Sequence, residues 1–218
     1  MADITSVISS VDAACVRYQQ DLQQIEEIEG LMQSIQNSLN RLQIEIQQTE
    51  IEMNSVEIEI SSLQSQINSS NDEDGPDQYA MQRVQLLYQK LQALNMKKVQ
   101  LEQQYQQYVS QYRQLQANLS NLQNDVETVR TYLQQVRAQM VSAAEMFQTK
   151  IDGFSSAASI LSGASGNMFA NSALSQVGNM TANQKAYEEN LAIAQSVIEK
   201  IDSTINDSGT SPVKVLRR

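Results

Sequence analysis

The stretch from residue 69 to residue 77 reads SSNDEDGPD and contains the chain's first proline, Pro76, directly after Gly75. Glycine and proline both interrupt helices, and the acidic side chains around them favour exposure to solvent. We therefore predict a turn at 70–77 that joins two helices, with Asp77 as the N-cap of the second one. Because this connection is short, we expect the two helices to lie side by side and antiparallel.

A seven-residue repeat of apolar positions runs without a break up to this turn, and it predicts a coiled-coil helix over about 3–69. Its first core position holds Ile4, Val11, Tyr18, Ile25, Met32, Leu39, Ile46, Met53, Ile60 and Ile67. The second core position, three residues later each time, holds Val7, Ala14, Asp21, Ile28, Ile35, Leu42, Thr49, Val56 and Leu63. Only Asp21 and Thr49 are polar in this second row.

The same repeat resumes after the turn and predicts a second helix over about 78–151. One row holds Val84, Leu91, Lys98, Tyr105, Tyr112, Leu119, Val126, Leu133, Met140 and Phe147. The companion row holds Leu87, Leu94, Leu101, Tyr108, Leu115, Leu122, Val129, Val136 and Ala143. The fold class is therefore predicted as all-α, with residues 1–152 forming a long antiparallel coiled-coil hairpin.

The position of the turn also predicts how the two helices are aligned. If the turn is centred near 73–74, the numbers of facing core residues sum to about 147, so that Ile60 faces Leu87. The same alignment brings the two weak core positions, Thr49 and Lys98, into one layer.

Outside the core, this alignment places acidic residues of the first helix beside lysines of the second. The predicted neighbours are Glu59 with Lys90 and Glu52 with Lys97. Each exposed pair contributes little, about 0.2–1 kcal/mol, but together the pairs favour this alignment over its neighbours.

One row of apolar residues has no place in the seam between the helices. Ile44, Ile51 and Ile58 lie seven residues apart and nearly opposite the seam, and Met96 and Val99 lie at a similar height on the second helix. Scattered surface apolar residues are common, but three isoleucines in one row favour a contact surface for another copy or for a partner helix.

The composition changes after residue 152. Residues 153–180 carry no charged side chain and are rich in small residues, which predicts short helices. A third helix is predicted over 181–206, with a disordered tail at 207–218. We expect the third helix to pack on the open end of the hairpin, against residues 4–30 and 120–147. An alternative is that 153–178 contacts or enters a membrane after a conformational change.

Composition excludes several kinds of chemistry. The chain has no histidine and one cysteine, Cys15, so imidazole catalysis, histidine ligation of metals and a cysteine-based zinc site are excluded. Its formal net charge of −10 makes nucleic acid an unsuitable partner. We therefore expect no enzymatic activity, no cofactor and no metal, and protein partners with helical interfaces, among them further copies of this chain.

The N-terminal residues do not have the basic and apolar segments of a Sec-type signal peptide, and no window is apolar enough to span a bilayer. We expect synthesis in the cytoplasm, and export, if it occurs, by a route that needs no such signal.

A helical hairpin without a signal, followed by a tail rich in small residues, resembles the WXG- and LXG-type substrates and partner proteins of bacterial type VII secretion. The resemblance implies a structural or adaptor protein that binds helical partners. The alternative function is a membrane-active, pore-forming or translocator-like protein that inserts 153–178.

Overall fold

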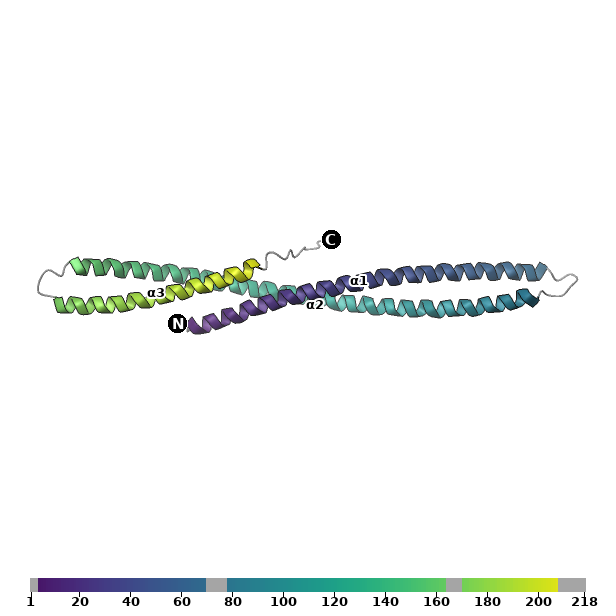
Figure 1. Ribbon diagram of the computed structural model, residues 1–218, viewed down its shortest axis with the longest axis horizontal. Coiled ribbons are helices and arrows are strands. Elements are labelled where there is room, and N and C mark those ends of the chain that lie inside the picture. Colours follow the sequence, from purple (N-terminus) through teal and green to yellow (C-terminus); the bar gives the residue numbers. More distant parts are fainter. Residues whose placement is uncertain (1–3, 70–77, 164–169, 208–218) are drawn as a thin grey trace. The chain divides into compact units, whose positions relative to one another are not determined.

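A computed structural model describes residues 4–69, 78–163 and 170–207. Over these residues the chain consists of three helices, α1 (Ile4–Ser69), α2 (Gln78–Gly163) and α3 (Ala170–Asp207), and it contains no strand (Figure 1). The all-α prediction is confirmed. The predicted turn at 70–77 and the tail from 208 onward lie outside the described residues.

The helix boundaries differ from the prediction in the region of small residues. α2 continues to Gly163 instead of ending near 151, and α3 begins at Ala170 instead of near 181. Two glycines of this region, Gly153 and Gly178, lie within α2 and α3. A glycine inside a helix costs only about 1 kcal/mol relative to alanine, so it does not by itself end a long helix.

The chain divides into two compact units. We call residues 26–120 the hairpin unit and residues 1–25 with 121–218 the three-helix unit. The hairpin unit contains parts of α1 and α2, and the three-helix unit contains the start of α1, the end of α2 and the whole of α3.

In the hairpin unit, the buried side chains come from the two core rows. Val56, Ile60, Leu87 and Leu94 form a buried cluster, with Met53, Leu63, Val84 and Leu91 packed against it. Ile60 and Leu87 thus lie in one cluster, as the predicted alignment requires.

In the three-helix unit, α3 completes a core that two helices alone would leave open. Its buried cluster comprises Val11, Cys15 and Tyr18 of α1, Val129, Leu133 and Val136 of α2, and Val197 and Ile201 of α3. Figure 1 shows α3, in yellow-green, running beside the C-terminal part of α2. Further along α2, the rings of Phe147 and Phe154 contact Tyr187, with centroids 6.0 and 5.7 Å apart. The prediction that the C-terminal helix packs on the open end of the hairpin is confirmed.

Candidate interaction surfaces

Three exposed isoleucines of the hairpin unit, Ile44, Ile51 and Ile58, form a row that we call the α1 ridge. Their exposed fractions are 55%, 68% and 70%. The spacing of seven residues keeps them on one face of the helix, and this face points away from the seam because the core rows occupy the other side. The ridge is therefore a row of exposed isoleucines about 10.5 Å apart along the helix, and no other part of the hairpin unit covers it.

The side chains next to the α1 ridge are polar and, apart from Arg41 at its N-terminal end, uncharged. The exposed residues one helical turn from the isoleucines include Gln47, Gln48, Asn54, Ser55, Ser61 and Ser62. The charges lie further round the helix, where α1 carries Glu45, Glu50, Glu52, Glu57 and Glu59, and no lysine or arginine follows Arg41 in α1. An apolar centre with a charged rim is the usual composition of a protein interface.

The predicted interface residues on α2 form a separate surface. Met96 and Val99, which we call the α2 patch, are 57% and 44% exposed. Met96 occupies the position of its heptad that lies opposite the seam, so the α2 patch and the α1 ridge lie on opposite edges of the hairpin unit. The sequence analysis grouped these five residues by height, and the structure does not bring them together.

Two ion pairs cross between the helices of the hairpin unit, and neither is one that we predicted. Glu59 pairs with Arg83 instead of Lys90, with Arg83 Nη2 2.6 Å from Glu59 Oε1. Arg83 and Lys90 occupy the same heptad position one repeat apart, and the guanidinium places both Nε and Nη2 on the carboxylate oxygen, which an ammonium group cannot do. This contact raises the pKa of Arg83.

The two polar side chains at core positions of the hairpin unit, Thr49 and Lys98, each form a hydrogen bond or ion pair. Thr49 is only 1% exposed, and its hydroxyl donates to the backbone carbonyl of Glu45 at 2.8 Å. Lys98 extends out of the seam, with Nζ 2.7 Å from a carboxylate oxygen of Glu50, and hydrogen bonding to Glu50 raises the pKa of Lys98. The long aliphatic part of lysine allows its charge to reach the rim in this way.

Several charges beside the two surfaces have no such partner. Within the described part of the chain, Glu52, Glu57, Lys90 and Lys97 form no ion pair, although all four are exposed. The predicted contact between Glu52 and Lys97 is therefore absent. Acidic charge beside the α1 ridge and basic charge beside the α2 patch both remain available to another molecule.

Tyr79 and Leu86 on α2, which were not predicted as surface residues, are 72% and 64% exposed. Together with Glu59 and Arg83 they line a shallow hollow. Their spacing of seven residues is the same signal that identified the α1 ridge, so the sequence did contain the information.

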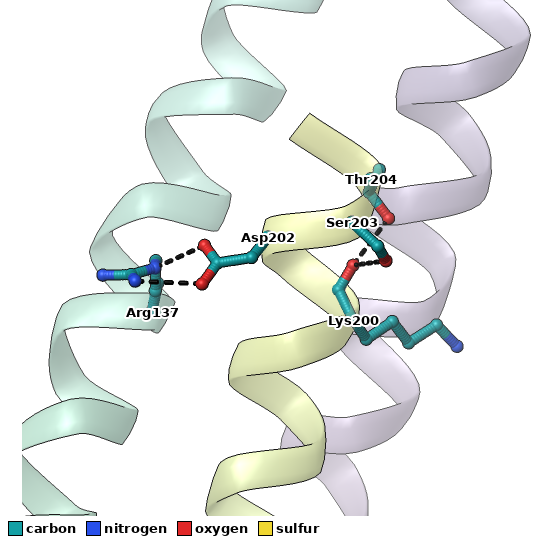
Figure 2. A network of polar contacts seen from close by, with 5 residues as sticks. All are labelled: Arg137, Lys200, Asp202, Ser203 and Thr204. Atoms are coloured by element: carbon teal, nitrogen blue, oxygen red, sulfur yellow. Dashed lines mark hydrogen bonds and ion pairs between the residues drawn. The ribbon is translucent and has the colours of Figure 1, made fainter. Parts of the chain in front are cut away.

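In the three-helix unit, polar contacts hold α3 on both sides. Figure 2 shows Asp202 pointing from α3 toward Arg137 of α2, while Lys200 points to the other side. Arg137 Nε lies 2.6 Å from Asp202 Oδ1, and Lys200 Nζ lies 2.5 Å from Asp12 Oδ1 on α1. The hydrogen bond from Arg137 lowers the pKa of Asp202. These contacts hold α3 between α1 and α2, and Asp12 and Lys200 also line a pocket of about 230 Å³.

Asp21 is a buried carboxylate at a core position of α1. It is 9% exposed, and its Oδ2 makes no hydrogen bond among the described residues, although Arg17 Nε lies 3.6 Å away. The sequence analysis identified Asp21 as a polar exception in the core, but its incomplete pairing is visible only in the structure.

Other kinds of site receive no support from the described residues. No group of three or more side chains there is arranged to hold a metal ion. No helix in the same part of the chain combines the length and the hydropathy needed to cross a bilayer. Comparison with protein-family models, curated proteins and solved structures finds no match to this chain.

Proposed function

We propose that this chain is a non-enzymatic, coiled-coil structural or adaptor protein that binds another helix through the α1 ridge. The observation that carries the proposal is the exposure of Ile44, Ile51 and Ile58, each more than half exposed, in one heptad row of a long helix. Large apolar side chains that repeat along one exposed helix face favour a binding surface.

The shape of the ridge selects the kind of partner. A straight row with a seven-residue period matches the apolar face of a second helix, whose side chains pack between those of the ridge. The uncharged neighbours such as Gln47 and Ser55 allow this helix to approach without removing a charge from water. The glutamates remain at the rim, where they select partners by charge.

A catalytic role has no comparable support. The chain has no histidine, and the ion pairs of Arg137 with Asp202 and of Lys200 with Asp12 join α3 to its two neighbouring helices. A place in type VII secretion stays a prediction, because it depends on the resemblance of a helical hairpin alone.

Photo-crosslinking from the ridge tests the proposal in the cells that make the protein. A photoreactive amino acid is placed at Ile51 or Ile58, and at Gln23 as a control from the same heptad row outside the ridge. We expect crosslinks to protein from positions 51 and 58 but not from 23. Crosslinks that are absent, or equally strong at all three positions, would show that the α1 ridge is ordinary surface.

A further inference from the structure

The charges around the α1 ridge argue against the simplest homodimer, in which two ridges face each other. Each ridge has glutamates on both sides, and the basic residue of α1 near it, Arg41, lies beyond its N-terminal end. Two facing ridges would therefore bring two acidic rims together, and like charges across an interface oppose association. The occupant of the ridge must instead offer apolar side chains with a basic rim.

Such a surface exists on the opposite edge of the same hairpin unit. The α2 patch, Met96 and Val99, is exposed, and the unpaired Lys90 and Lys97 lie beside it. The heights also match, because the alignment that brings Ile60 to Leu87 puts Met96 level with Ile51.

We propose that the α1 ridge of one copy docks on the α2 patch of a second copy. In this contact α1 runs antiparallel to the neighbour's α2, as the two helices do within each hairpin. Matched heights then place the neighbour's Lys97 near Glu52, which pairs two charges that have no ion-pair partner among the described residues of one chain. The inference rests on the proposed function and specifies the partner as another copy of this chain.

The contact is heterologous, since it joins two different surfaces. A copy that uses its ridge keeps its own patch free, and a copy that uses its patch keeps its ridge free. Association of this type does not stop at two copies but continues into a ring or an open array. The wild-type protein should therefore form species larger than dimers as its concentration rises.

Sedimentation velocity on the full chain tests this with two variants, a ridge variant (I51Q/I58Q) and a patch variant (M96Q/V99Q). Each should remain monomeric alone, because each lacks one half of the contact. Mixed together they should form a one-to-one dimer and nothing larger, since only one intact ridge and one intact patch can meet. Unchanged circular dichroism and melting temperature show that the variants are folded.

Charge reversal supplies the second measurement. The K97E and E52K variants should each weaken self-association and should recover it when mixed, while the matched control K150E should associate like the wild type. A patch variant that dimerises alone, or a wild-type chain that stays monomeric at high concentration, would overturn the inference. In the second case, crosslinks from Ile51 to a different protein would still support the proposed function.

Discussion

Arg137 on α2 donates two hydrogen bonds to Asp202 on α3, with Nε 2.6 Å from Oδ1 and Nη2 2.9 Å from Oδ2 (Figure 2). A guanidinium that donates in parallel to both oxygens of a carboxylate restricts direction as well as distance. The pair therefore selects one alignment of α3 along α2, in addition to the apolar contacts of Val197 and Ile201.

Replacing Arg137 with lysine should loosen α3 although the charge is kept, because an ammonium group cannot donate to both oxygens in this geometry. We expect faster amide hydrogen exchange in α3 of Arg137→Lys, faster still in Arg137→Met, and no change in the hairpin unit. Hydrogen exchange with mass spectrometry measures this. Exchange in α3 that is the same in all three proteins would show that the pair does not hold the helix.

The docking of α3 should weaken in acid. Arg137 lowers the pKa of Asp202 below its ordinary value of 3.8 in the folded state. The contribution of this pair is therefore fully present above the unfolded-state pKa and is lost as the pH falls through the lower folded-state value. As the pH falls from the unfolded-state to the folded-state pKa of Asp202, the protection of α3 amides from hydrogen exchange should decrease more in the wild type than in Asp202→Asn. Equal pH dependence in both proteins would contradict this assignment.

Leu133 and Ile201 are each 0% exposed and lie in one cluster. Truncation of either side chain to alanine should lower the free energy of unfolding by about 2–5 kcal/mol, because it removes buried surface and leaves a cavity. Val16→Ala, at a site that is 52% exposed, is the control and should change stability by less than about 0.5 kcal/mol. Urea denaturation followed by circular dichroism gives the comparison.

Asp21→Leu should stabilise the three-helix unit by about 1–3 kcal/mol, since a buried carboxylate oxygen without a hydrogen bond carries a desolvation cost of that order. Asp21→Asn retains the shape and separates the effect of charge from that of packing. Thermal melts measure both variants. A destabilised leucine variant would mean that the contact with Arg17 outweighs the desolvation cost.

The alignment of the hairpin can be read from disulfide formation. In a Cys15→Ala background, cysteines at positions 60 and 87 should form an intramolecular disulfide, because Ile60 and Leu87 share a buried cluster. The pair 60 and 94 tests an alignment shifted by one heptad and should crosslink poorly. Efficient crosslinking of the shifted pair alone would refute the predicted alignment.

The helices and their buried faces could be predicted from the sequence, because a coiled coil depends on the spacing of apolar residues within each helix. The spacing of Val11, Tyr18 and Ile25 specifies a helix and its buried face, whatever that face packs against. The exposure of Ile44, Ile51 and Ile58 followed from the same periodicity, since a residue opposite the seam of a two-helix pair has nothing to cover it.

The tertiary structure determined which contacts form where a charged side chain has several possible partners. The heptad repeat offers Glu59 both Arg83 and Lys90 one repeat apart, and only the three-dimensional arrangement selects Arg83. It likewise separates the α1 ridge from the α2 patch, places Asp202 beside Arg137, and leaves Asp21 Oδ2 without a hydrogen bond. The period of a helix determines the direction in which a side chain points. The contact that a flexible charged side chain makes depends on distances of a few ångströms between chain segments, and the period does not specify them.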